Sequence, residues 1–108
     1  MAQSEMNRCA DLDDRQAEAD LNRVYRELLS KLKSDDNATR KLRAAQRAWL
    51  AFRGAHLQEL YPAKDKQAEY GSMFPMCYAQ VATVMTKERT AQLRRILDDK
   101  DPCDIAGG

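Results

Sequence analysis

The chain has 108 residues, with 18 Lys and Arg against 17 Asp and Glu and a formal net charge of +1. This length suits one domain with a single hydrophobic core, and so balanced a charge argues against a dedicated nucleic-acid-binding domain. No apolar run approaches the roughly 20 residues of a membrane-spanning helix, and residues 1–20 are too polar and acidic for a signal peptide. The sequence therefore predicts one domain, residues 1–108, without a transmembrane segment.

The first predicted element is a long helix over about residues 5–33. Between Asp11 and Asp20 it carries five acidic residues against a single base, Arg15. Its apolar residues recur at steps of three and four, which is the period of a helix and not of a strand. They are Met6, Cys9, Ala10, Ala17, Leu21, Val24, Tyr25, Leu28 and Leu32.

A second helix is expected over about residues 37–61. The segment Asp35-Asp36-Asn37 supplies N-cap chemistry before it, and Tyr61-Pro62 ends it. Aromatic residues at helical spacing usually mark core, so we expect Trp49 to be largely buried between the first and third helices. The apolar stripe to which it belongs comprises Leu42, Ala45, Trp49, Phe52, His56 and Leu60.

The third helix is expected over about residues 72–98, with Ser72 as its N-cap and Asp98-Asp99 at its end. Its stripe comprises Tyr78, Ala82, Met85, Arg89, Leu93, Ile96 and Leu97. The short connection after the first helix implies antiparallel neighbours, and no β-rich run occurs. The fold class is therefore predicted as all-α, an antiparallel up-down-up three-helix bundle with its core in residues 5–98 and an irregular tail at 99–108.

The sequence offers little catalytic or metal-binding chemistry. The single histidine, His56, is better explained as a hydrogen-bonded, partly buried side chain than as a base. A second histidine for a zinc pair is absent, and Asp11 to Asp14 lack the glycine and terminal glutamate of a calcium loop. We therefore predict a protein that is not an enzyme, with no catalytic residues, no metal site and no cofactor.

Three short patterns, EMNRCA, AAQRAWLAFR and TKER, occur in one chain and in a particular order. Together they resemble the LprI-like family of small bacterial envelope proteins, which is named for a lysozyme inhibitor. The match runs from about Met6 to Leu97. Gly54 and Leu57 stand where members commonly carry Asp and Cys, and a cysteine upstream of the first pattern is missing. The residues that carry the resemblance are Asn7, Leu21, Tyr25, Gln46, Arg47, Trp49, Phe52, Arg53, Gly71, Thr86 and Arg89.

The resemblance implies an exported binding module, periplasmic or secreted, whose signal peptide has been removed. Its partner would be a protein, with a lysozyme as the one that the family name suggests. An alternative is a structural or assembly protein of the cell envelope without inhibitor activity. Nucleic-acid binding through the basic second helix is a third reading, which the balanced net charge disfavours.

The three cysteines leave two arrangements open. Composition alone is equally compatible with three reduced thiols in a cytosolic protein. Helix arithmetic puts Cys9 and Cys77 four residues into their helices and in one layer of the bundle, whereas Cys103 lies in the tail. The resemblance favours a Cys9–Cys77 disulfide formed in an oxidising compartment.

Two surfaces are candidates for binding a partner. The first is the acidic stretch with Asp11, Asp13 and Asp14, which would attract a basic lysozyme; alternatively, Arg47 and Arg53 of the second helix pair with these acids. The second is the polar connection between the last two helices, which is otherwise an ordinary exposed loop. Its candidate residues are Lys64, Asp65, Glu69, Tyr70 and Ser72.

Overall fold

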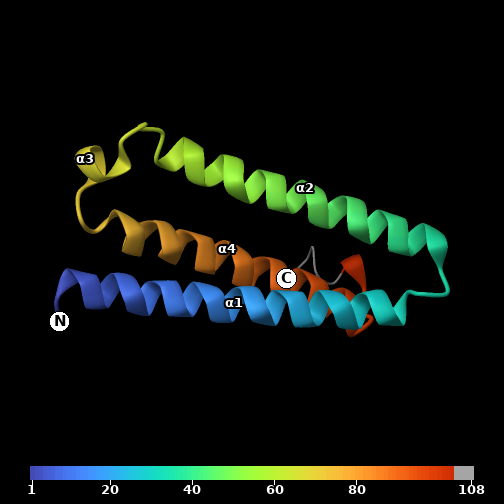
Figure 1. Cartoon of the computed structure of the whole chain (residues 1–108). Helices are drawn as coiled ribbons and strands as arrows, with labels where there is room; N and C mark the ends of the chain where they lie inside the picture. The colour runs from blue at the N-terminus through green and yellow to red at the C-terminus, as the bar shows by residue number, and fades with distance from the viewer. Residues whose placement is uncertain (104–108) are drawn as a thin grey trace.

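The computed structural model of the chain describes residues 1–103 and is entirely helical over that range, without a strand. Its elements are α1 (Gln3–Lys31), α2 (Asp36–Leu60), α3 (Lys66–Tyr70) and α4 (Phe74–Leu97). The three long helices run up, down and up, so that α1 and α4 are parallel and α2 is antiparallel to both (Figure 1). Among the described residues, no helix is long and apolar enough to cross a membrane.

The all-α prediction is confirmed, and the three long helices begin and end within a few residues of the predicted bounds. The predicted three-helix bundle is not confirmed, because there are four helices and the long ones are unequally packed. The prediction of an irregular tail falls partly on residues 104–108, which lie outside the described residues.

Helices α1 and α4 lie side by side along their lengths. Small side chains at their contact allow the two helix axes to approach closely. Asn7 Nδ2 donates to the Ser72 carbonyl oxygen at 3.0 Å near one end of the pair, and Lys31 Nζ donates to the Leu97 carbonyl oxygen at 2.7 Å near the other. The buried small residues are Ala10 and Ala17 of α1 and Ala79, Ala82, Thr83, Thr86 and Thr90 of α4.

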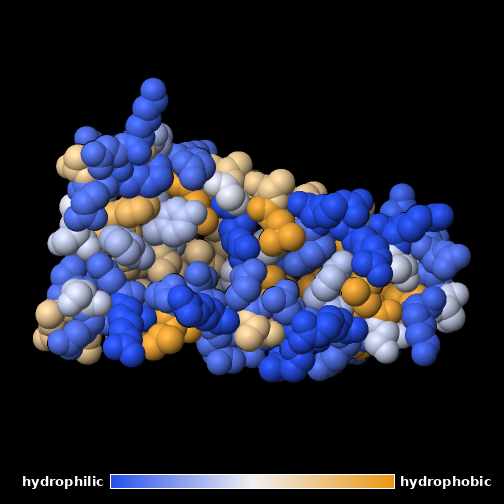
Figure 2. All heavy atoms as spheres, in the orientation of Figure 1, coloured by the Kyte–Doolittle hydropathy of each residue, from blue (hydrophilic) through white to orange (hydrophobic). Residues whose placement is uncertain are grey.

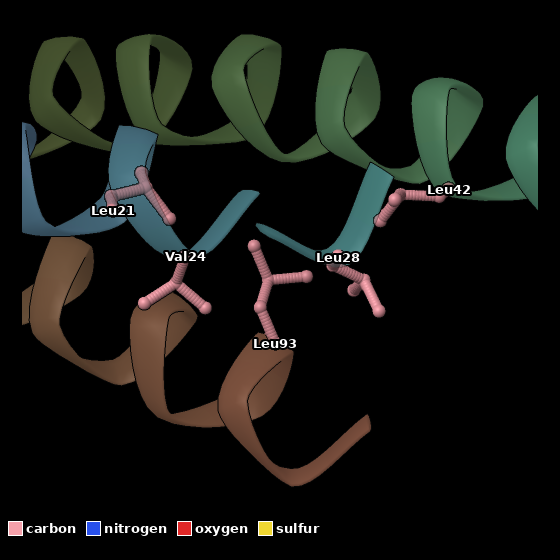
Figure 3. Packing of buried hydrophobic residues seen from close by; sticks show 5 residues of the cluster. All are labelled: Leu21, Val24, Leu28, Leu42 and Leu93. Atoms are coloured by element: carbon pink, nitrogen blue, oxygen red, sulfur yellow. The ribbon is translucent and has the colours of Figure 1, made fainter. Parts of the chain in front are cut away.

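The apolar core lies toward the C-terminal half of α1. Leu42 of α2 and Leu93 of α4 converge there on one face of α1 (Figure 3). Full burial of one such side chain contributes about 1.5–3 kcal/mol, so this cluster fixes the N-terminal half of α2 against the α1–α4 pair. The core residues are Leu21, Val24, Leu28, Leu42 and Leu93.

The inward face of α2 differs from the predicted stripe. It follows Leu42, Gln46, Trp49, Arg53 and Leu57, of which only Leu42, Gln46 and Leu57 are buried. Since each residue turns a helix by about 100°, the position before Arg53 is rotated off this face. The prediction of a buried apolar stripe was wrong for those of its members that are exposed: Phe52, with 57% of its surface accessible, Leu60, and also Ala45 and, in α4, Ile96.

Trp49 is half-buried against the core instead of fully enclosed between α1 and α4. The guanidinium of Arg53 lies over its ring, 4.7 Å from the centroid, and occupies part of the space that a neighbouring apolar residue would fill. The prediction of a largely buried indole was therefore wrong. His56 is half-buried and its Nδ1 lies 2.8 Å from Glu59 Oε2, which confirms the prediction for that side chain.

The connection between α2 and α4 is folded, because it contains the short helix α3. Asp65 caps this helix by accepting a hydrogen bond from the Ala68 backbone N–H at 3.0 Å. Lys66 Nζ donates to the carbonyl oxygens of Tyr61 at 2.6 Å and Ala63 at 2.8 Å. Gly71 then adopts a φ of +80°, a conformation that glycine tolerates without strain.

An aromatic cluster holds α3 on the end of the molecule. The rings of Tyr61 and Phe74 pack edge to face, with centroids 5.2 Å apart, and Tyr70 contacts both. Tyr78 completes the cluster from the first turns of α4. A five-residue helix is too short to produce a hydrophobic period, which is why the sequence pattern did not predict it.

Candidate functional site

Two polar contacts join α2 to the α1–α4 pair. Arg53 donates from Nη1 to Glu18 Oε2 at 2.7 Å and from Nη2 to Glu18 Oε1 at 3.3 Å, a bidentate pair. The same Nη1 also donates to Thr86 Oγ1 at 2.9 Å. One guanidinium therefore links all three long helices, and the expectation that Arg53 pairs with an acid of the first helix is confirmed.

The second contact lies about two turns along α2. Gln46 Oε1 accepts a hydrogen bond from Arg89 Nε at 3.0 Å. Burial lowers the pKa of the Arg89 guanidinium from its usual range, because desolvation disfavours the charged form. These residues give several positions of the family pattern a structural explanation: they hold α2 at a fixed distance from its neighbours.

A groove remains between α1 and α2 beside these contacts. Its α1 wall presents Glu18, Asn22 and Tyr25, while its α2 wall presents Arg43 and Arg47. An adjoining groove continues past Asp14, Arg15, Gly54 and Tyr78 toward the α3 end. The walls thus carry opposite charge, a surface suited to binding a polar partner.

The acidic residues separate into two faces of α1. Asn7, Asp11, Asp14 and Glu18 are spaced by four, three and four residues, so they lie along one edge, whereas Asp13 lies on another face. Asp11 is exposed and pairs with Arg15 at 3.0 Å. We call Asp11, Asp14 and Glu18 the acidic edge.

Asp14 is the perturbed member of the acidic edge. Burial raises its pKa above the ordinary value, and the neighbouring charges of Glu18 and Asp11 raise the pKa further, while Arg53 opposes the shift. Repulsion between acids on one edge is the expected result of concentrating negative charge there. The edge is therefore poised for a cationic partner that would relieve it.

The candidate residues of the connection lie on the surface of the α3 end. Lys64, Asp65, Glu69 and Ser72 are exposed, as are the neighbouring apolar side chains of Leu60 and Met73, which the sequence did not single out. Because Ser72 is bonded to Asn7, this end adjoins the acidic edge. The structure thus brings the two predicted surfaces together at one end of the molecule.

Tyr70 differs from the other candidates in that connection. It is half-buried in the aromatic cluster, and its hydroxyl accepts a hydrogen bond from the Ala63 backbone N–H at 3.0 Å. These contacts give Tyr70 a structural part in holding α3. Its contact with a partner stays a prediction.

A second, apolar groove lies between α2 and α4. Figure 2 shows hydrophobic side chains reaching the surface between the hydrophilic edges, over the region where α4 lies between α1 and α2. Its lining includes His56, Val81, Val84 and Met85, and Val84 is 56% exposed. Phe52 stacks on His56 beside this groove, with ring centroids 5.6 Å apart.

The cysteines are all free in this structure. Cys9 and Cys103 are exposed, and Cys77 is half-buried. Cys9 and Cys77 lie near the same ends of α1 and α4, as the helix arithmetic indicated, but no bond joins them. Their disulfide stays a prediction.

Comparison with known proteins gives two matches. A family model described as lysozyme inhibitor LprI matches residues 1–93. An uncharacterized protein of Rhizobium meliloti (strain 1021) is 30% identical over 112 aligned positions, which cover 94% of this chain and 78% of that protein. No solved structure matches the chain.

Proposed function

The chain belongs to the family of the lysozyme inhibitor LprI, and from this premise we propose that it is an exported binding protein that inhibits a lysozyme by covering the enzyme's substrate cleft. The observation that carries the proposal is the match over residues 1–93, which spans α1, α2, α3 and most of α4. Blockade of this kind requires a shaped surface and no chemistry from the inhibitor itself.

The acidic edge supplies long-range attraction in this proposal. Lysozymes are commonly basic, and an acidic surface speeds encounter with a basic protein by electrostatic steering. Asp11 is exposed and Asp14 has a raised pKa, so neither charge is fully neutralised within the chain. A cationic rim around a lysozyme cleft would complement this edge.

The α3 end supplies the contact surface. The aromatic cluster and the three hydrogen bonds of Lys66 fix its backbone before any partner arrives, so binding would cost little ordering entropy. Exposed Leu60 and Met73 offer apolar area beside Lys64 and Ser72. Lysozymes cleave with a pair of carboxyl groups, to which an ammonium or a hydroxyl could donate.

An envelope assembly role is the alternative, and one observation favours it. The apolar groove between α2 and α4, with Phe52 and Val84 exposed, resembles a surface that is covered in a larger complex. In that case the chain would bind a structural partner through this face and leave lysozymes unaffected.

The decisive experiment is a titration of the purified protein against lysozymes of several types in a cell-wall lysis assay. We expect inhibition that weakens as salt rises, because the acidic edge contributes steering. Replacing Asp11 and Asp14 by Asn should mainly slow association, whereas Lys64→Ala with Met73→Ala should mainly speed dissociation.

A matched control carries the same loss of two negative charges at the opposite end, through Asp98→Asn and Asp101→Asn, and should inhibit as the parent does. Unchanged inhibition in both test variants would exclude the chosen surface. Absence of binding to every lysozyme at low salt would exclude inhibition itself and favour the assembly role.

A further inference from the structure

The N-terminal half of α2 carries a row of positive charge without an internal counterpart. Arg40, Arg43 and Arg47, which we call the arginine stripe, are spaced by three and four residues and lie along one edge of the helix. All three are exposed, and within residues 1–103 none of them forms an ion pair. The segment from Asn37 to Gln58 contains no acidic residue that could neutralise them.

Two adjoining grooves meet at the arginine stripe. One lies on α2 beside Asn37, Arg40 and Lys41. The other lies between α2 and α1 and is lined by Asn22 and Tyr25. Because Arg43 and Arg47 line both, the grooves form a continuous track with cationic side chains along it and an amide and a phenol on its α1 side.

The chemistry of this track matches phosphate groups in a row. A guanidinium binds phosphate through two parallel N–H donors, and seven residues of helix separate the outer arginines by about 10 Å. One small anion could occupy only part of that length. A flat lipid surface would instead require apolar residues beside the cations, and among the exposed large apolar residues only Leu50 lines these grooves.

We propose that the arginine stripe binds a linear, phosphate-bearing polyanion, which lies along the track between α1 and α2. The acidic edge and the arginine stripe then serve partners of opposite charge, since a basic lysozyme would be repelled by the stripe. Binding of the polyanion does not depend on whether the chain inhibits a lysozyme.

The test uses end-labelled inorganic polyphosphate as the probe and fluorescence anisotropy of the full chain over a series of salt concentrations. We expect binding whose logarithm falls linearly with the logarithm of the salt concentration. Substituting Arg43→Gln together with Arg47→Gln should weaken binding about tenfold or more and reduce the salt slope by about 1 per arginine.

The matched control removes two exposed arginines from the last turn of α4, Arg94→Gln with Arg95→Gln, and should bind within about twofold of the parent. Circular dichroism verifies that each variant is helical, and Arg40→Gln alone repeats the test if the double variant fails to fold. An equal loss in the control would overturn the proposal, because net charge and not the stripe would then decide binding.

Three further results would also overturn it. The first is absence of polyphosphate binding at low salt. The second is binding to phosphatidylglycerol vesicles but not to polyphosphate, which would assign the stripe to a membrane surface. The third is loss of lysozyme inhibition in the Arg43/Arg47 double variant while polyphosphate binding persists, which would assign the stripe to the inhibitory surface.

Discussion

The two interfaces of this molecule are built on different principles. Between α1 and α4, buried alanines and threonines let the helices approach closely along their whole length. Between α2 and that pair, only Leu42, Gln46 and Leu57 are buried, and two polar contacts bridge the remaining distance. The first interface gives rigidity, and the second leaves grooves and exposed charge available for partners.

The largest effect is expected from a covalent tie within the rigid pair. In protein isolated from an oxidising compartment, a Cys9–Cys77 disulfide should form and stabilise the fold by about 4 kcal/mol through closure of a long loop. Mass spectrometry without reductant detects the link, and Cys9→Ser should lower stability while Cys103→Ser should not. Three alkylatable thiols in such a preparation would refute the bond.

A core truncation in α4 tests the tight interface itself. Leu93 is fully buried, so Leu93→Ala should cost about 3 kcal/mol through lost burial and a residual cavity. Phe52→Ala removes a larger side chain from α2 but should change the free energy of unfolding by no more than about 0.5 kcal/mol, because Phe52 is mostly exposed. Urea denaturation measures both, and similar losses would mean that α2 is packed as closely as α4.

The polar bridge of α2 should matter less than the core. Arg53→Gln removes both bonds to Glu18 and the bond to Thr86, and we expect a cost of about 1–2 kcal/mol, between the values for exposed and buried charge pairs. Arg47→Gln is the matched control, since Arg47 is exposed. Equal stability of the two variants would show that the bridge does not hold α2.

The smallest effect concerns the acidic edge. The raised pKa of Asp14 means that the folded state binds its proton more tightly than the unfolded state does. The charged carboxylate therefore destabilises the fold at pH values above its raised pKa, and this penalty disappears as the pH falls through that pKa toward the unfolded value.

Asp14→Asn should accordingly raise stability at pH 7 by up to about 0.5 kcal/mol and should lose this advantage near pH 3. Thermal denaturation at the two pH values measures the difference, with Asp13→Asn as a control for the change in net charge. A variant that is less stable at pH 7 would show that Arg53 outweighs burial and the neighbouring acids at Asp14.

Much of the fold was predictable because it depends on local periodicity. The bounds of α1, α2 and α4 followed from apolar spacing and from capping residues such as Asp35, whose side chain accepts a hydrogen bond from the Ala38 backbone N–H. The ion pair of Arg53 with an acid of α1 was also anticipated from the segregation of charge. The exposed candidates Asp11, Lys64 and Glu69 could be named from polarity alone, although nothing in their spacing identifies a partner.

The rest required the tertiary structure. Periodicity identifies an apolar sector of a helix but not which part of that sector faces a neighbour, so it could not show that Arg53 points inward while Phe52 points out. Nor could it show that Tyr70 packs with Tyr61 and Phe74, because aromatic residues in a short connection have no period. The joining of Ser72 to Asn7 is likewise a contact between distant parts of the chain.

The sequence by itself determined an all-helical chain and its charge segregation, since helix propensity, capping and residue type act over a few neighbouring positions. Only the tertiary structure decided that α1 and α4 pack tightly while α2 stands off on Gln46 and Arg53. The reason is that the distance between helices depends on the side chains that meet from both, and small residues meet only between α1 and α4. That difference leaves the grooves beside α2 open.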